Sequence, residues 1–340
     1  MNNGINPHIS RKKRKEKSLE AYLDGLAAGD RYILSEVLTI VESTSETHQA
    51  IAQQILATVR PADSEDTLRI GITGSPGAGK STLIEQLGLY LVSQGKRVAV
   101  LAIDPSSTRT EGSILGDKTR MAQLSNTDLA YVRPTASATH LGGVSKTTRE
   151  SIAICEKAGY DIILVESVGV GQSEVELAGL VDAYVLVLLP GGGDDVQGIK
   201  RGVVELADLL VINKADGDRL PLAKQSKKDY AGAIRLFPHE LAGYIPEVLL
   251  VSALTGTGID RLWEGVQSYV QQSKTAGYFV DRRRAQDQAY MQQQVVLYLQ
   301  RIVAADAVVA ADDYAKDGDQ ASLFAKTKLM LDSIAQKLNS

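Results

Sequence analysis

The most constraining feature of the sequence is a glycine-rich segment, Gly74–Thr82, which reads GSPGAGKST. It follows an apolar run, Leu68–Thr73, and precedes an amphipathic stretch, Leu83–Gln94, so GxxxxGK[ST] stands in the strand, loop and helix context that the motif needs. Glycines allow backbone N–H groups to point inward around a β-phosphate, and the helix start adds partial positive charge. Lys80 is expected to bridge the β- and γ-phosphates, and Ser81 to offer its hydroxyl to Mg²⁺. The predicted phosphate-binding residues are Gly74, Ser75, Pro76, Gly77, Ala78, Gly79, Lys80, Ser81 and Thr82.

A second motif indicates which base the nucleotide carries. Asn213–Asp216 reads NKAD and comes directly after the apolar run Leu209–Ile212, where NKxD loops bind a base. The Asp216 carboxylate can accept hydrogen bonds from guanine N1–H and the exocyclic amine, and adenine lacks these donors, so guanine is favoured. Ser252–Leu254 follows the run Val248–Val251 and matches the companion loop whose backbone amide meets guanine O6. The predicted base-binding residues are Asn213, Lys214, Asp216, Ser252, Ala253 and Leu254.

Two acidic residues follow predicted strands. Asp104 ends the run Arg97–Ile103 and Glu166 ends the run Asp161–Val165. The ligand crevice of an open α/β sheet lies at the carboxyl ends of its strands, so both carboxylates are expected to face the glycine-rich loop. Glu166 also opens an ExxG sequence, in which Glu166 can hold Mg²⁺ or its water and Gly169 can offer its N–H to the γ-phosphate. Ordinary turn acids or helix caps are the alternative interpretation.

Two polar loops are candidate switches. Ser106–Met121 contains Asp117 and two glycines, and such a loop can order around Mg²⁺ and a γ-phosphate and relax after hydrolysis. Gly191–Lys200 is rich in glycine and follows the apolar run Ala183–Leu189. A merely flexible connection explains this second loop equally well.

The pattern of apolar runs predicts the fold class. Between Leu68 and about Val270, seven short apolar runs alternate with amphipathic helical stretches, which is typical of a mostly parallel sheet flanked by helices. Ser18–Arg60 has helical spacing, and Gly29-Asp30 is expected to divide it into two helices. After Gly277 only helical patterns remain, and their apolar positions predict a dimerisation arm. The expected parts are an N-terminal helical segment (1–60), a P-loop domain (61–276) and a C-terminal helical arm (277–340).

Composition excludes several other classes of protein. The chain has 340 residues, with 37 Lys and Arg against 41 Asp and Glu. It therefore lacks the excess of positive charge that is typical of a nucleic-acid-binding protein. Its single cysteine, Cys155, cannot form an internal disulfide, and its four histidines show no metal-ligand spacing. A reducing compartment, the cytoplasm, is expected. No apolar run reaches the ~18–20 residues that span a bilayer, so no membrane association is predicted.

With these motifs in place, the sequence closely resembles the MeaB/ArgK group of P-loop GTPases, chaperones associated with methylmalonyl-CoA mutase. The matching segments are Gly74–Thr82, Asp104–Ser107, Gly112–Met121, Leu141–Ser145, Glu166–Glu174, Asn213–Asp218 and Ser252–Ile259. The resemblance covers nearly the whole chain. It implies a Mg²⁺-dependent GTPase that couples GTP binding and hydrolysis to GDP with loading, gating or protection of adenosylcobalamin in an acyl-CoA mutase.

The resemblance also implies roles for particular residues. Ser81, Asp104, Asp117 and Glu166 become the Mg²⁺ and switch residues, and Gly191–Lys200 becomes an additional switch loop that senses the mutase through Lys200. Lys80, Asp104 and Glu166 are the expected catalytic residues, with one of the acids placing the attacking water. The sequence departs from the family in two places: Ser167 stands where Thr is usual, and Thr135–His140 differs from the usual Ser/Pro-rich run.

Three other functions are alternatives for a sequence with these motifs. A P-loop kinase linked to amino-acid transport would need an acceptor pocket and would not need guanine-binding loops. A nucleotide-binding adaptor would bind GTP without significant hydrolysis. A nickel-insertion GTPase is disfavoured because the sequence lacks Cys/His clusters.

Overall fold

The computed structural model describes residues 17–59, 67–104, 121–136, 143–167, 172–191, 201–237 and 239–316. The chain divides into two compact units, Met1–Val280 and Asp281–Ser340. The first unit contains the sheet and all the nucleotide-binding motifs, so the site is built within it. The three-part division expected from the sequence stays a prediction.

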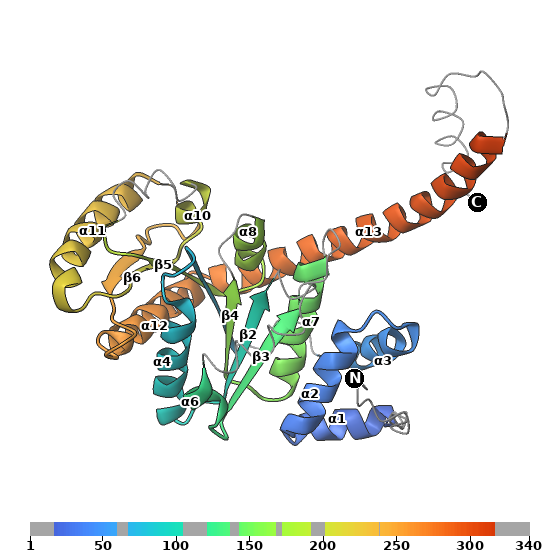
Figure 1. Ribbon diagram of the computed structural model, residues 1–340, viewed down its shortest axis with the longest axis horizontal. Helices are drawn as coiled ribbons and strands as arrows, with labels where there is room; N and C mark the ends of the chain where they lie inside the picture. The colour runs from blue at the N-terminus through green and yellow to red at the C-terminus, as the bar shows by residue number, and fades with distance from the viewer. Residues whose placement is uncertain are drawn as a thin grey trace, which may run out of the picture. The chain divides into compact units, whose positions relative to one another are not determined.

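A seven-stranded parallel sheet forms the centre of the first unit (Figure 1). Its order is β3-β2-β4-β1-β5-β6-β7, and every neighbouring pair is parallel. The strands are β1 (Leu68–Gly74), β2 (Val98–Asp104), β3 (Ala130–Ala136), β4 (Ile162–Ser167), β5 (Ala183–Leu188), β6 (Leu209–Ile212) and β7 (Glu247–Leu250). The predicted α/β class and its seven strands are confirmed.

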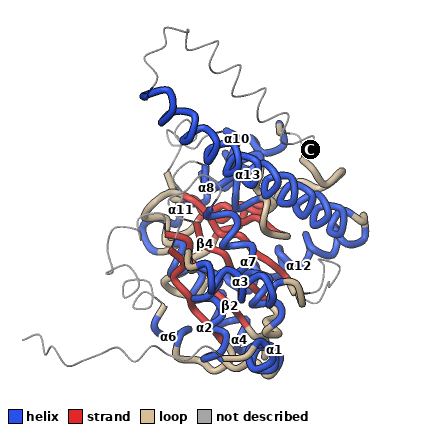
Figure 2. Tube along the Cα trace, turned by 90° about the vertical axis from the view of Figure 1, so that its right-hand side faces the viewer, coloured by secondary structure: helices blue, strands red, loops and turns tan. Residues whose placement is uncertain are grey.

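Helices cover both faces of this sheet, as the side view in Figure 2 shows. This is why the strands are apolar at nearly every position: all six residues of β5 are buried. One core lies under α4 (Lys80–Ser93), α6 (Ala122–Ser125) and α12 (Ile259–Thr275). The other lies under α7 (Gly143–Lys157), α8 (Gln172–Ala178), α10 (Arg201–Glu205) and α11 (Leu220–Ala233). Two short 3₁₀ turns, η1 (Gly217–Arg219) and η2 (Ile234–Leu236), flank α11.

The N-terminal segment contains three helices, whereas the sequence predicted two: α1 (Leu19–Ala27), α2 (Arg31–Glu42) and α3 (Glu46–Leu56). The predicted break exists, because Gly29 adopts φ +69° and the Asp30 side chain caps α2 by accepting hydrogen bonds from two backbone amides. The second break falls at a run of small hydroxylated residues that ends in Ser45, the N-cap of α3. These helices pack on α7, and Arg133 of β3 forms an ion pair with Glu42.

The last described element is α13 (Tyr278–Lys316), a single helix of 39 residues. Gly277, with φ +74°, separates it from α12. Two separate helical segments were expected after Gly277; the one expected beyond residue 316 lies outside the described residues. Phe279 is buried, so the first residues of α13 belong to the packing of the first unit.

Candidate functional site: the nucleotide-binding loops

The glycine-rich loop connects β1 to α4 and needs glycine at both of its ends. Gly74 has φ +143°, and a Cβ there would lie 2.0 Å from the carbonyl oxygen of Val187 in β5. Gly79 has φ +87° at the N-cap of α4, and a Cβ there would lie 2.6 Å from Asn213 Nδ2. Any side chain at either position would push neighbouring elements away. The loop is therefore held tightly between β5 and the segment after β6.

Lys80 is the first residue of α4, directly after this loop, and its side chain is buried. Its Nζ donates hydrogen bonds to the carbonyl oxygens of Gly74, at 2.8 Å, and Ser75, at 3.2 Å. Burial lowers the pKa of Lys80, while the carboxylates of Glu166 and Glu174 act to raise it. The Lys80 ammonium group is thus held by two carbonyl oxygens and by nearby negative charge. A bound phosphate would take the place of these partners.

Ser81 and Glu166 are brought together from segments far apart in the chain. The Ser81 hydroxyl at the start of α4 donates to Glu166 Oε1 at 3.0 Å. Asp104 is the last residue of β2, and the adjacent pair Ile103 and Ser167 shows that β2 and β4 end side by side. Hydroxyl and carboxylate oxygens are ligands that Mg²⁺ prefers, so the chemistry of this donor set fits the ion.

Several predicted residues are not placed by the structure. The Asp104 side chain, together with Asp117, Gly169 and Lys200, lies outside the described part of the chain. Their assignments remain predictions.

Asn213 connects the glycine-rich phosphate loop, Gly74–Thr82, to the second predicted base loop, Ser252–Leu254. Its Nδ2 donates to the carbonyl oxygen of Ala78 at 2.8 Å, and its Oδ1 accepts from the Ala253 amide at 3.0 Å. The two predicted base loops also meet directly, since the Ser252 hydroxyl donates to Asp216 Oδ2. Leu254, at the end of the second loop, is 82% exposed. The loops after β1, β6 and β7 therefore form one continuous edge.

Sequence reasoning missed one buried acid in this region. Glu174 in the first turn of α8 is only 8% exposed, and its charge acts on Lys80. Beneath α8, Ser167 donates to the Thr73 hydroxyl at 2.7 Å. In the sequence Glu174 is one of many helical acids, and only its place in the fold distinguishes it.

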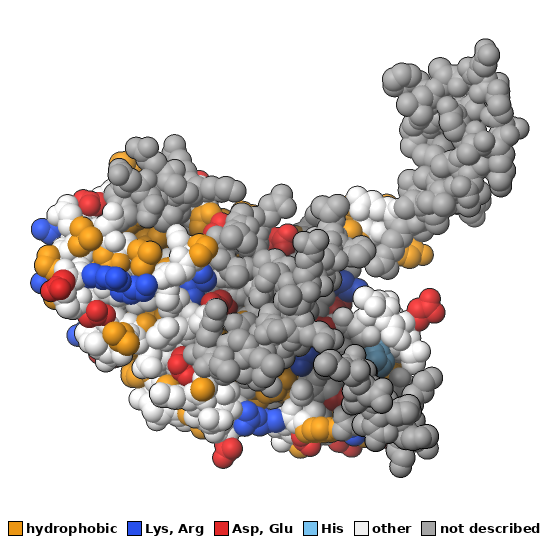
Figure 3. All heavy atoms as spheres, in the orientation of Figure 1, with side chains coloured by type: hydrophobic (Ala, Val, Ile, Leu, Met, Phe, Trp, Pro, Cys, Tyr) orange, Lys and Arg blue, Asp and Glu red, His pale blue; other side chains and the backbone are white. Residues whose placement is uncertain are grey.

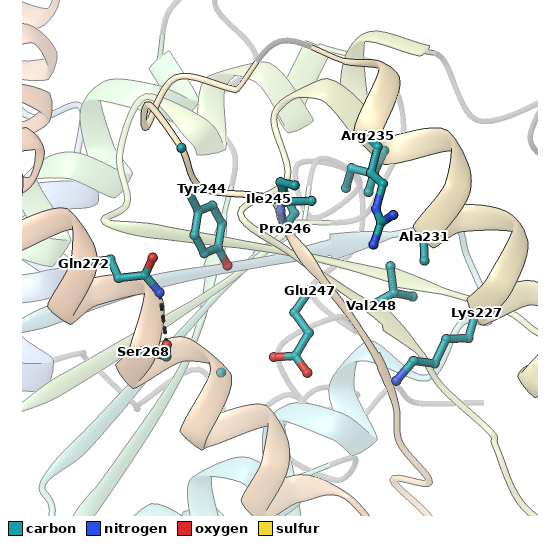
Figure 4. A pocket seen from close by; sticks show the side chains of 13 residues that line it. Lys227, Ala231, Arg235, Tyr244, Ile245, Pro246, Glu247, Val248, Ser268 and Gln272 are labelled. Carbon is teal, nitrogen blue, oxygen red and sulfur yellow. Dashed lines mark hydrogen bonds between the residues drawn. The ribbon is translucent and has the colours of Figure 1, made fainter.

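A separate pocket of about 480 Å³ lies between α11 and α12, beside the amino end of β7. Figure 4 shows the charged ends of Lys227, Arg235 and Glu247 around this space. The base loop Ser252–Leu254 follows the opposite, carboxyl end of the same strand. This pocket is therefore distinct from the nucleotide-binding loops.

The parallel sheet, with a GxxxxGKST loop leading from β1 into α4, defines the class of P-loop nucleoside triphosphatases. The model of one protein family, described as methylmalonyl Co-A mutase-associated GTPase MeaB, matches residues 34–307. A Mycobacterium bovis protein named as a probable GTPase is 51% identical over 268 residues, which is 78% of this chain and 80% of that protein. The chain therefore belongs to the MeaB family and is a GTPase.

Further comparisons agree with this family. The GTPase ArgK of Escherichia coli is 43% identical over 279 residues, covering 82% of this chain and 84% of that protein. The mitochondrial methylmalonic aciduria type A homolog of mouse is 43% identical over 287 residues, or 82% of this chain and 69% of that protein. A crystal structure titled LAO/AO transport system kinase has a TM-score of 0.72 and 32% identity, and the match covers 95% of this chain and 99% of that one.

Within the described residues, no helix combines the length and the hydropathy that a membrane span requires.

Proposed function

We propose that this GTPase couples its nucleotide state to loading, gating or protection of adenosylcobalamin in an acyl-CoA mutase. The observation that carries the proposal is the match of 274 residues, 34–307, to a family described as associated with methylmalonyl-CoA mutase. The name of the mouse relative, methylmalonic aciduria type A homolog, points to the same metabolism. The cofactor itself would belong to the mutase, because this chain has only four dispersed histidines.

The residues around the phosphate loop have complementary roles in hydrolysis. Lys80 leaves the carbonyl oxygens of Gly74 and Ser75 and contacts the β- and γ-phosphates, where it neutralises developing charge. Ser81 and Glu166, with Asp104 and Asp117, would hold Mg²⁺, which when bound draws negative charge from the phosphate oxygens. Glu166 or Asp104 orients the attacking water. No side chain need bond covalently to phosphate.

The base loops would select guanine. Asp216 accepts from the base, and the Ser252 hydroxyl that now donates to Asp216 holds the carboxylate in place. Because the Ala253 amide already donates to Asn213, the amide of Leu254 is the group we assign to guanine O6.

The mutase-coupling role is tested by the response of hydrolysis to the partner. We expect an adenosylcobalamin-dependent acyl-CoA mutase to raise GTP turnover, and Lys200→Ala to reduce that rise severalfold while intrinsic turnover stays nearly unchanged. The reason is that Lys200 ends a glycine-rich loop whose charges can change partners when a second protein docks. Turnover is measured with and without mutase for the parent, Lys200→Ala and a control, Lys228→Ala, which lies on α11. Equal stimulation of all three would leave Gly191–Lys200 an ordinary connection.

We propose that the protein forms a homodimer through α13. This helix exposes apolar side chains on one face, at positions spaced by three and four residues: Met291, Val295, Tyr298 and Leu299. Figure 3 shows hydrophobic side chains at the surface of the described part of this helix. Apolar stripes of this kind are commonly buried against a second chain.

We therefore expect the full-length protein to sediment as a dimer, and the double variant Val295→Glu with Tyr298→Glu to sediment as a monomer that still binds GTP. Two charges placed in an apolar interface cannot be desolvated without a large cost. The control adds the same charges on the opposite face of the helix, as Gln293→Glu with Gln300→Glu. A double variant at the stripe that remains dimeric would place the interface elsewhere.

The transport-linked kinase remains a second candidate because the solved structure with 32% identity carries that title. A kinase would transfer the γ-phosphate to an acceptor, whereas a GTPase releases it as inorganic phosphate. An adaptor would release none. Following the labelled γ-phosphate of GTP distinguishes the three.

A further inference from the structure

Two buried hydroxyl groups join β1 to β4 next to the phosphate loop. The Ser167 hydroxyl donates to the Thr73 hydroxyl at 2.7 Å, and both side chains are fully buried. The same face of the sheet is otherwise apolar around them: Val165 is fully buried, and Leu177 of α8 packs closely on Gly71. Burying polar groups in such a layer is costly, and apolar side chains would fill it without that cost. The pair therefore indicates a role beyond core packing.

The hydroxyl pair continues the pairing of β1 with β4 beyond its last backbone pair. In the register of the two strands, the final pair is Ile72 with Glu166. Thr73 and Ser167 are the next residues of their strands, and they are joined by side chains. The hydroxyl bond thus holds the two strands together at the level where the chain leaves β1 for the glycine-rich loop.

Each hydroxyl is next in sequence to a group of the proposed nucleotide site. Thr73 precedes Gly74, whose carbonyl oxygen accepts from Lys80 Nζ at 2.8 Å. Ser167 follows Glu166, whose carboxylate accepts a hydrogen bond from the first turn of α4 at 3.0 Å. Successive side chains of a strand point to opposite faces, so Ser167 is anchored on the α8 side of the sheet while Glu166 points to the α4 side. The Thr73–Ser167 bond therefore helps to fix the separation between the loop and the Glu166 carboxylate.

That separation matters most for the proposed Mg²⁺ ligands. Ser81 is carried by the helix that follows the loop, and Glu166 by the end of β4, so their relative position depends on how β1 and β4 are held. Mg²⁺ requires near-ideal octahedral geometry, and a small displacement of one ligand weakens its binding.

We propose that Thr73 and Ser167 are positioning residues for the Mg²⁺ site. Their hydroxyl bond sets the spacing between the glycine-rich loop and Glu166, and it acts from the opposite face of the sheet. The inference rests on the proposed GTP and Mg²⁺ site and adds two residues that act through Gly74 and Glu166.

The test measures how the affinity for a non-hydrolysable GTP analogue depends on Mg²⁺ concentration, by calorimetry on the full-length protein. We expect Ser167→Ala and Thr73→Val each to raise the half-maximal Mg²⁺ concentration by about three- to tenfold, the scale of one ordinary hydrogen bond. Ser167→Thr and Thr73→Ser keep both hydroxyls and should stay close to the parent.

Helix α7 offers matched controls. The hydroxyls of Thr148 and Ser151 are buried there and have no hydrogen-bond partner among the described residues. Thr148→Val and Ser151→Ala make the same chemical changes without breaking a bond between strands, so they should leave the Mg²⁺ requirement unchanged.

The double variant Thr73→Val with Ser167→Ala separates positioning from stability. Removing one hydroxyl leaves its buried partner unpaired and lowers the free energy of unfolding, whereas replacing both by apolar groups is nearly neutral. We expect the double variant to unfold near the urea midpoint of the parent and still to need the higher Mg²⁺ concentration, because every variant removes the same bond. A Mg²⁺ requirement that recovers together with stability would overturn the proposal, as would single variants that behave like the parent.

Failure of the underlying site gives a different result. A parent protein that binds no analogue contradicts the GTP site, and one that binds it without any dependence on Mg²⁺ contradicts the metal site; either result overturns the inference as well. A Mg²⁺-dependent parent matched by its variants contradicts the inference alone. If Thr73→Val fails to fold, the comparison of Ser167→Ala with Ser151→Ala decides the question.

Discussion

Lys80→Ala is expected to lower single-turnover GTP cleavage by about 10² to 10³-fold or more, the range seen when one transition-state-stabilising donor is removed. The effect should be large because the Lys80 side chain is cationic, is 7% exposed and lies at the loop that we propose surrounds the phosphates. Cleavage of labelled GTP by excess enzyme is measured beside far-UV circular dichroism. Lys96→Ala is the matched control, because Lys96 is an exposed lysine beyond the other end of α4.

Two further variants extend the same assay to the acids. Glu166→Ala removes the acceptor of the Ser81 hydrogen bond, and Asp104→Ala removes the acid at the neighbouring strand end. Both should slow cleavage while the fold stays intact. Unchanged cleavage in Lys80→Ala would contradict the phosphate-loop assignment, and unchanged cleavage in Glu166→Ala would remove Glu166 from the site.

Asp216→Asn is expected to weaken GTP binding at least a hundredfold and to shift preference toward xanthosine triphosphate. The change replaces one acceptor by a donor, which leaves guanine N1–H and the amine without their full complement of acceptors. Xanthine presents a carbonyl oxygen in place of the amine and suits the new donor. Affinities for GTP, XTP and ATP are measured by displacement of a fluorescent nucleotide.

Asp218→Asn is the control for this variant, because Asp218 lies two residues further along and is exposed. It should keep the parent preference for GTP. Equal affinity of the parent protein for ATP and GTP would be incompatible with the base assignment, whatever the variants do.

Local sequence patterns were sufficient to predict the sheet and the phosphate loop. A strand buried on both faces must be apolar at nearly every position, and β5 meets this requirement without exception, so its pattern is unambiguous. Gly74 and Gly79 are similarly constrained, because their backbone angles and their close neighbours exclude a side chain. Where one short segment determines the structure, that segment is enough to predict it.

The remaining features depend on contacts between distant segments. The position of Glu174 near Lys80 follows from the adjacency of β4, β1 and β5 and from the packing of α8 on Gly71, none of which a local pattern encodes. The start of α3 was missed for a different reason: the Ser45 side chain forms no capping hydrogen bond, so the helix depends on packing for its stability.

The Asn213 side chain forms hydrogen bonds to two different loops, and this affects how strictly the protein selects its nucleotide. One amide side chain joins the phosphate loop to the loop after β7, so neither can be displaced without disturbing the other. A nucleotide with the wrong base, if it strains the base loops, would therefore also misalign the loop that we propose positions its phosphates. Discrimination against such a nucleotide would then appear twice, first as weaker binding and again as slower chemistry on whatever fraction does bind.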